Sequence, residues 1–237
     1  MSILVVKVGG AVAGDSAAAV LELAAAHQVC VVHGAGPQIS AEMEQAGVPV
    51  EFIGGRRVTT EAGIAIVRSS LAAVNAALCA VIGDRAIPLF GDEIGLKATP
   101  VPELGLVGEA VIEELPAIAA ALGRGGIPVV APIAEGPLNV NADSAAAAIA
   151  CSLHADELRF LTDVEGFMID GEVVDSIEYE DALGLLNGGT LEGGIIPKLR
   201  AALSAAEWGI KGFIGRTKIE PVAWRAVEPL DLIEEQA

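Results

Sequence analysis

Two asparagines and one aspartate alternate with apolar residues in the run Asn-Val-Asn-Ala-Asp at 139–143, which leads into an alanine-rich stretch. Residues two apart in an extended segment point to the same face. Asn139, Asn141 and Asp143 are therefore expected to gather on one side, where a strand ends and a helix begins. Buried polar side chains need partners, because burial without a hydrogen bond costs free energy. The run predicts a ligand site, and Asp143 is also a candidate helix cap.

Three basic side chains stand beside glycine-rich segments. Lys7 precedes Gly9-Gly10, Arg57 follows Gly54-Gly55, and Lys198 follows the glycines of 188–194. Such glycines bring backbone N–H groups close to an anion, and the cations add charge. Taken singly, Lys7 is more often an ordinary lysine at a strand end, and Arg57 is more often a solvated arginine on a hairpin. Lys198 is more telling, because a lysine in the first turn of a helix opposes the helix dipole.

The segment His-Gly-Ala-Gly-Pro-Gln at 33–38 closes a predicted strand and opens a predicted helix. Ligands of open parallel sheets bind beyond the carboxyl ends of the strands, where helix N-termini attract anions. The spacing is not that of a dinucleotide fingerprint, and no Gly-x-x-x-x-Gly-Lys-Ser/Thr occurs in the chain. An anion-binding loop and a purely structural turn both fit this segment.

Composition narrows the class of protein. The 237 residues are 53% hydrophobic but only 3% aromatic, and the formal net charge is −18. So acidic a surface disfavours nucleic acid and anionic lipid as partners. Charged residues, Gly, Pro or Asn interrupt the apolar stretches, which argues against a membrane span. The three cysteines and three histidines show no metal-ligand spacing, so we expect no metal site, small buried thiols and a cytoplasmic location.

Short β-branched runs alternate with alanine-rich helical ones along the chain. This rhythm predicts an α/β fold, a three-layer αβα sandwich with a mainly parallel central sheet. We expect one continuous domain, with an N-terminal lobe at 1–154 and a C-terminal lobe at 155–237. Strands are predicted at 2–8, 28–33, 85–90, 127–131, 157–162 and 211–215, helices at 15–26, 37–47, 60–79, 113–123, 142–153, 178–187 and 194–208, and hairpin-like segments at 48–59, 95–110 and 167–174.

Together these segments resemble the amino-acid kinase family, and within it the branch that phosphorylates N-acetyl-L-glutamate. The resemblance runs in order from residue 3 to about 216, and its motifs are Lys-Val-Gly-Gly at 7–10, His-Gly-Ala-Gly-Pro-Gln at 33–38, Arg-Val-Thr at 57–59, Asn-Val-Asn-Ala-Asp at 139–143, Leu-Thr-Asp-Val-Glu-Gly at 161–166 and Gly-Gly-Ile-Ile-Pro-Lys at 193–198. It implies a carbamate kinase-like fold. Two departures are Ala35, where the family has glycine, and the segment after Arg216.

The resemblance also implies roles. Lys7 and Lys198 would stabilise the transferring phosphoryl group of ATP, which travels with Mg²⁺, and Asp143 would orient both lysines. The acceptor N-acetyl-L-glutamate would lie in the first lobe, against Gly10, Ala35, Gly36, Arg57, Asn139 and Asn141. ATP would lie in the second lobe, against Asp163, Val164, Glu165, Gly166, Phe167, Met168, Thr190, Leu191 and Glu192. The attacking carboxylate is already ionised, so no general base is needed.

Relatives that arginine inhibits carry an extra N-terminal helix that builds a hexamer, and the chain begins directly at the first strand. The resemblance therefore implies an arginine-insensitive homodimer whose first lobe carries the dimer contact. Two other functions remain open at this point. One is a kinase for carrier-bound aminoadipate or glutamate, which would need a wide, basic entrance to the acceptor site. The other is a non-catalytic nucleotide-binding member of the family, which could dispense with both lysines and Asp143.

Overall fold

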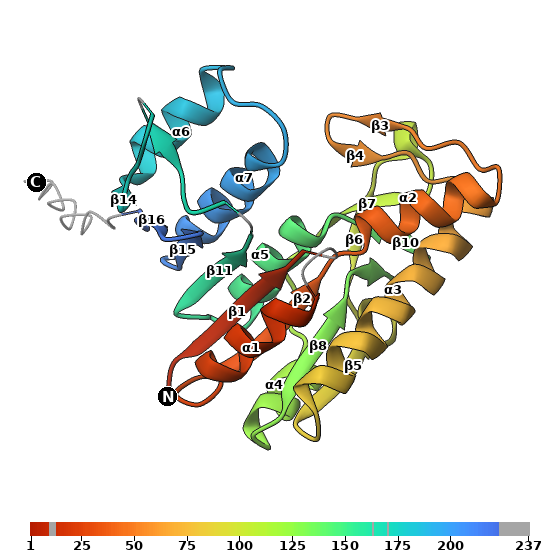
Figure 1. Cartoon of the computed structure of the whole chain (residues 1–237), viewed down its shortest axis with the longest axis horizontal. Coiled ribbons are helices and arrows are strands. Elements are labelled where there is room, and N and C mark those ends of the chain that lie inside the picture. The colour runs from red at the N-terminus through yellow and green to blue at the C-terminus, as the bar shows by residue number, and fades with distance from the viewer. Residues whose placement is uncertain (10–12, 163, 170, 223–237) are drawn as a thin grey trace, which may run out of the picture.

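A twisted eight-stranded sheet forms the centre of the molecule (Figure 1). The structure is a computed structural model that describes residues 1–9, 13–162, 164–169 and 171–222. In sheet order the strands are β14 (Ser176–Ile177), β16 (Thr217–Ile219), β15 (Lys211–Ile214), β11 (Glu157–Leu161), β1 (Ile3–Val8), β2 (Gln28–His33), β8 (Ile127–Ala131) and β5 (Ala86–Phe90). All neighbouring strands are parallel except β15 and β16. The carboxyl ends of β1, β2, β8 and β11 therefore lie at one edge, where a site is expected.

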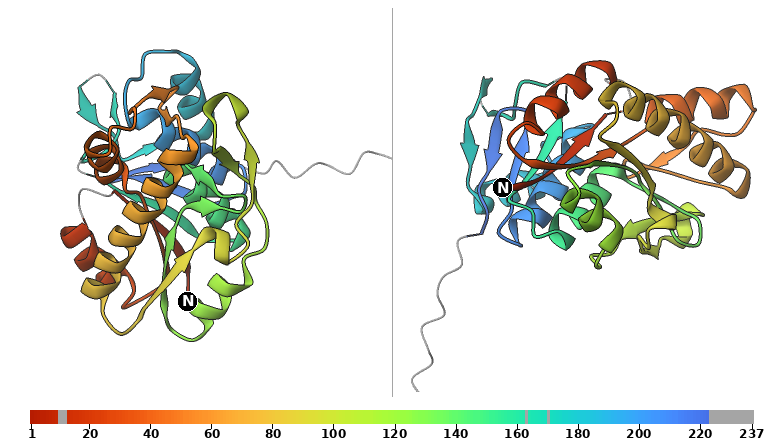
Figure 2. Two further views of the ribbon diagram at one scale, coloured as in Figure 1. Left: turned by 90° about the vertical axis from the view of Figure 1, so that its right-hand side faces the viewer. Right: turned by 90° about the horizontal axis from the view of Figure 1, so that it is seen from below.

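Helices cover both faces of the sheet (Figures 1 and 2). One face carries α1 (Ala13–Leu23), α2 (Gly36–Gln45) and α3 (Glu61–Ile82), and the other carries α4 (Pro116–Gly123), α5 (Ala142–Ser152), α6 (Tyr179–Asn187) and α7 (Ile195–Ala206). Strand β1 shows why: Leu4, Val6 and Val8 pack into the hydrophobic cluster on the first face, while Val5 packs into the cluster on the second. The three-layer αβα sandwich predicted from the sequence is confirmed.

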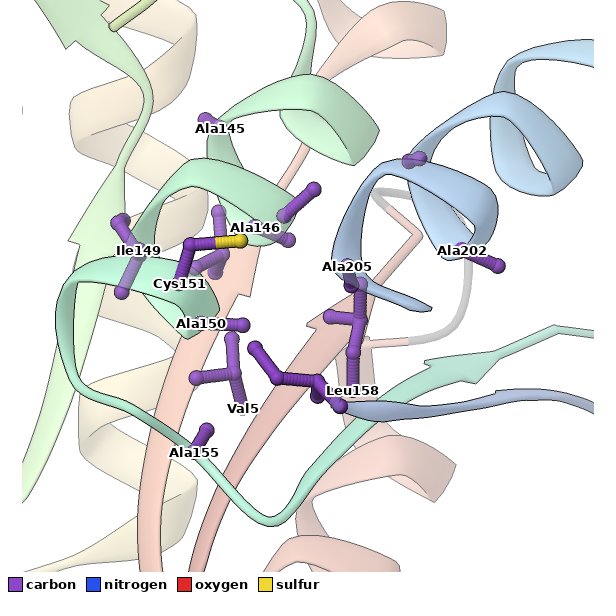
Figure 3. Close-up of a cluster of buried hydrophobic side chains, with 14 of the residues drawn as sticks. Val5, Ala145, Ala146, Ile149, Ala150, Cys151, Ala155, Leu158, Ala202 and Ala205 are labelled. Carbon is purple, nitrogen blue, oxygen red and sulfur yellow. The ribbon is translucent and has the colours of Figure 1, made fainter. Parts of the chain in front are cut away.

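Alanines let the helices approach the sheet closely. Helix α5 buries an uninterrupted run from Ala145 to Cys151 against α7, β1 and β11 (Figure 3). An ideal Cβ added at Gly212 would lie 2.9 Å from Cβ of Ala202 on α7, so the backbones of β15 and α7 are almost in contact. Dense packing of this kind replaces the large aromatic residues that the composition lacks.

Short strands beyond the edge of the main sheet build the surroundings of the site. A second sheet has the order β6 (Ala98–Pro100), β7 (Val107–Ala110), β10 (Leu138–Val140) and β9 (Ile133–Ala134), with 3-10 turns at Gly91–Glu93 and Pro102–Leu104. Two hairpins are formed by β3 (Phe52–Ile53) with β4 (Arg56–Arg57) and by β12 (Met168–Ile169) with β13 (Glu172–Val173). Strands β6 and β7 are also antiparallel, so all three hairpin-like segments predicted from the sequence are confirmed. The prediction missed β9, β14 and β16, because a strand of two or three residues shows no period.

Helix α3 is long and apolar enough to cross a membrane by length and composition alone. It packs against α1, α2, β5 and β8, and its buried face carries Val67, Leu71, Val74 and Leu78. A core helix of a folded domain has the same properties, so the helix by itself is weak evidence for a membrane span.

Candidate active site

A buried ion pair marks the centre of the site. Nζ of Lys7, near the carboxyl end of β1, lies 2.9 Å from Oδ1 of Asp143 in the first turn of α5, and their side chains are 11% and 6% exposed. The contact is an ion pair by distance and lacks the angle of a hydrogen bond. A buried carboxylate without a cation would be costly, so each residue requires the other. Lys7 therefore cannot be a solvated lysine at a strand end.

Both asparagines of the 139–143 run make side-chain hydrogen bonds to residues beside the site. Asn139 Nδ2 donates to Thr59 Oγ1 at 3.0 Å, and Thr59 is fully buried. Asn141 Oδ1 accepts hydrogen bonds from the backbone N–H groups of Asp143 and Ser144, at 2.8 and 3.2 Å. Asn141 is thus the N-cap of α5, and the reading of Asp143 as a cap is wrong. Its carboxylate lies one position too far into the helix and pairs with Lys7.

Arg57 is 7% exposed, and so it is not the solvated hairpin arginine of the alternative reading. Its Nη2 donates to the Gly36 carbonyl at 3.0 Å and to Ser40 Oγ at 2.7 Å. The guanidinium lies 4.6 Å from the centroid of the Phe52 ring, across the β3–β4 hairpin. Burial lowers the pKa of Arg57, but an arginine stays protonated in proteins. The β4 strand thereby holds a fixed positive charge against the loop at Gly36.

Lys7, Arg57 and Asp143 line one cavity of about 200 Å³. Arg56 is a third cation at its wall and forms an ion pair with Glu109 of β7. The remaining lining includes Ala35, Gly36, Asn139 and Asn141, and the apolar residues Ile39, Phe52, Leu71, Val107, Pro132 and Val140. A cavity with converging cations and an apolar wall suits a small anionic molecule that also carries an apolar group. All the described residues predicted to bind the acceptor line this cavity.

Ala35 fits its position without strain. Its φ is −141°, in the range open to residues with a side chain, and its methyl group is buried at the cavity wall. Pro37 follows at the start of α2, as expected for the first turn of a helix. The alanine therefore takes space from the cavity without distorting the loop.

The residues predicted to bind the nucleotide are only partly brought together. Val164, Glu192 and Lys198 line a second cavity of about 310 Å³ with Thr162, Gly194 and Ile195. Lys198 Nζ donates to the Gly194 carbonyl at 3.1 Å. The structure thus places Lys7 and Lys198 at two different cavities. Gly10 and Asp163 lie outside the described residues.

Other residues of the predicted nucleotide set face elsewhere in this structure. Phe167 is buried in the hydrophobic core, and its backbone N–H donates to Thr217 Oγ1 at 2.7 Å. An ideal Cβ on Gly166 would lie 2.6 Å from the same oxygen, so this glycine permits close packing with β16. Leu191 also packs against the core. The side chains of Glu165, Met168 and Thr190 are exposed.

Several residues that line the cavity at Lys7, Arg57 and Asp143 were not predicted from the sequence. Phe52, Arg56 and Val107 line it from β3, β4 and β7. The sequence held a signal for Phe52, because the pair Gly54-Gly55 is typical of a hairpin turn. In the structure both glycines have positive φ, and the turn pairs Phe52 with Arg57. Val107 had no signal, since its place depends on the pairing of β7 with β10.

The fold and this site define a class of protein. The family model described as amino acid kinase family matches residues 2–216, and the chain belongs to that family. It is 39% identical over 220 residues to an acetylglutamate kinase of Rubrobacter xylanophilus, which covers 89% of this chain and 87% of the relative. Among solved structures, smu.665 of Streptococcus mutans superimposes with a TM-score of 0.83 at 28% identity, covering 92% of this chain and 98% of that one. Carbamate kinase of Giardia lamblia, solved with AMP-PNP, shares the fold, with a TM-score of 0.71, 15% identity and coverage of 92% and 98%.

Proposed function

We propose that this protein transfers the γ-phosphoryl group of ATP to the γ-carboxylate of N-acetyl-L-glutamate, giving N-acetyl-L-glutamyl 5-phosphate and ADP in arginine biosynthesis. The observation that carries the proposal is the cavity at Lys7, Arg57 and Asp143, which suits a small dicarboxylate with an apolar substituent. The similarity to acetylglutamate kinases supports it over most of the chain.

The chemistry needs positioning and charge neutralisation rather than a covalent nucleophile. The ionised γ-carboxylate of the acceptor attacks the phosphorus, and the bond to the ADP oxygen breaks. Lys7 neutralises negative charge that develops in the transition state, and Asp143 holds Lys7 in place. Arg57 and Asn139 bind the α-carboxylate end of the acceptor, and the backbone N–H groups of Gly10 and Gly36 donate to the transferring group.

The nucleotide binds to the C-terminal lobe, beside the second cavity. Lys198 is positioned there by α7 and reaches the phosphates when the two substrates are bound together. Among the described residues, no group of three His, Cys, Asp or Glu side chains could hold a metal ion. The Asp143 carboxylate is paired with Lys7. Mg²⁺ would travel with ATP, because hard cations prefer phosphate oxygens and water, and it would neutralise part of the phosphate charge.

The protein acts as a cytoplasmic homodimer that uses α3 as its contact. The outer face of α3 exposes Ala62, Ala65, Ser69, Ala73, Ala76, Ala77, Ala80 and Val81. Strand β5, beside it, is an edge of the main sheet. A broad face of small apolar residues next to a free strand edge is suited to pairing with a second copy. Light scattering of the purified protein tests this, and a monomer at micromolar concentration contradicts it.

Hydroxylamine trapping of the acyl phosphate tests the reaction. We expect hydroxamate to form with ATP and N-acetylglutamate, and not with glutamate, aspartate or no acceptor. Lys7→Ala and Lys198→Ala should each lower turnover by about a hundredfold or more, because each removes a charge stabiliser. Lys97→Ala is the matched control, since Lys97 is a surface lysine paired with Glu113. Absence of acceptor-dependent hydroxamate refutes the reaction, and near-normal turnover of Lys198→Ala refutes its role.

A further inference from the structure

One buried histidine has no part in the proposed chemistry. His33 ends β2 and is fully buried. It directly precedes the loop from Gly34 to Gly36, which lines the cavity at Lys7, Arg57 and Asp143, called the acceptor cavity below. Its ring has two polar neighbours: Nε2 lies 3.1 Å from Nδ2 of Asn75, and Nδ1 lies 3.4 Å from the Gly34 carbonyl oxygen. Asn75 lies on the buried face of α3 and is 1% exposed.

The orientation of the Asn75 amide follows from its other partners. One atom of the amide lies 2.8 Å from the carbonyl oxygen of Val129 on β8. A carbonyl oxygen can only accept, so that atom must be the nitrogen. The amide oxygen then faces Cys79 Sγ at 3.6 Å, where the thiol can donate to it. A flipped amide would set two acceptors against each other at Val129.

The amide orientation determines the proton on His33. Nδ2 of Asn75 has two hydrogens, of which one is directed to Val129 and the other to His33. Nε2 of His33 must therefore accept, and the ring proton is on Nδ1, which points at the Gly34 carbonyl. Burial lowers the pKa of His33 to about 4, which keeps the ring neutral at physiological pH. The other tautomer would place a lone pair of Nδ1 against the Gly34 oxygen.

The Gly34 carbonyl belongs to the loop that faces the acceptor. Two residues further on, the Gly36 carbonyl accepts from Arg57, and the Gly34 N–H donates to Val8 of β1. A contiguous set of contacts thus runs from α3 through Asn75 and His33 to the loop and to Arg57.

We propose that Asn75 is a positioning residue for acceptor binding, which holds His33 as the neutral Nδ1–H tautomer and thereby fixes the loop from Gly34 to Gly36. The role in acceptor binding rests on the proposed function. Asn75 lines neither the acceptor cavity nor the second cavity, and it acts through His33.

The tautomer can be observed in the unmodified protein. The chain has three histidines, so two-bond ¹H–¹⁵N correlation spectra are simple to assign, with His33→Gln identifying the signal of residue 33. We expect His33 to show the Nδ1–H pattern and no titration between pH 6 and 8. An Nε2–H pattern at His33, or its titration in this range, refutes the proposal.

Replacement of Asn75 tests the effect on the acceptor. Asn75→Ala leaves Nε2 of His33 without its donor, and we expect the KM for N-acetylglutamate to rise at least fivefold, with kcat and the KM for ATP changed less than twofold. Ser70→Ala is the matched control: Ser70 is fully buried on the same helix, and its hydroxyl has no hydrogen-bond partner in the described structure. An unchanged acceptor KM, or equal rises in both KM values, overturns the proposal.

Failure of the proposed function remains distinguishable from failure of this inference. If the unmodified protein forms no product with N-acetylglutamate, the reaction is refuted, and the tautomer is still decided by the spectra. The position of the loop is then monitored through the backbone amide shifts of Gly34 and Gly36. These should move in Asn75→Ala and stay in place in Ser70→Ala, and identical shifts in both variants overturn the role of Asn75.

Discussion

Replacement of Lys7 by methionine separates the structural role of the Lys7–Asp143 pair from its catalytic role. At 2.9 Å and an effective dielectric constant of about 20, the gross attraction is about 6 kcal/mol, most of which offsets the loss of hydration on burial. Lys7→Met keeps the volume but leaves the 6% exposed carboxylate of Asp143 without a cation. We therefore expect the free energy of unfolding to fall by about 3 to 4 kcal/mol.

The double variant Lys7→Met/Asp143→Asn supplies the decisive comparison. It removes both charges, so it should be about 2 kcal/mol more stable than Lys7→Met alone, although it carries one more substitution. Urea unfolding followed by far-UV circular dichroism measures both values. Both variants should be inactive, although they differ in stability, because the proposed reaction needs the charge of Lys7. The reasoning fails if the two substitutions are additive, or if Lys7→Met is as stable as the surface control Lys97→Met.

Two further predictions concern other buried positions. Gly91→Ala would place a Cβ against the carbonyl oxygen of Ile133 and 2.7 Å from Leu96 Cδ2, so we expect the free energy of unfolding in urea to fall by about 2 kcal/mol. In the control Gly123→Ala, in α4, the added Cβ meets no atom within 4 Å, and the free energy of unfolding should not fall. Equal effects of the two substitutions would contradict the close packing at Gly91. The pKa of His33 is about 4 in the folded chain and 6.5 in an exposed histidine, so the unfolded chain takes up the proton first as the pH falls. Because of His33, the free energy of unfolding should drop by about 3 kcal/mol as the pH falls from 6.5 to 4. His33→Gln should lose this part of the pH dependence. If the variant keeps the same pH dependence, His33 is not buried as a neutral ring.

Much of the fold followed from periodicity. The strand at 3–8 and the helix at 142–152 are marked by local hydrophobic pattern, and the predicted elements lie within a few residues of the observed ones. The predicted site at 139–143 also depends only on local rules, because alternation in a strand and the start of a helix fix where three side chains point. The sequence did not reveal which of them caps the helix, since Asn141 and Asp143 both have suitable oxygens.

The sequence by itself determined the αβα class, the family resemblance and the polar run that ends at Asp143. All three depend on residue types within short segments of the sequence. Only the tertiary structure decided that Lys7 pairs with Asp143, that Phe167 faces the core, and that Asn75 reaches His33 from 42 residues away. Such contacts depend on the order of strands in the sheet and on the packing of α3 against it, and no local pattern encodes either.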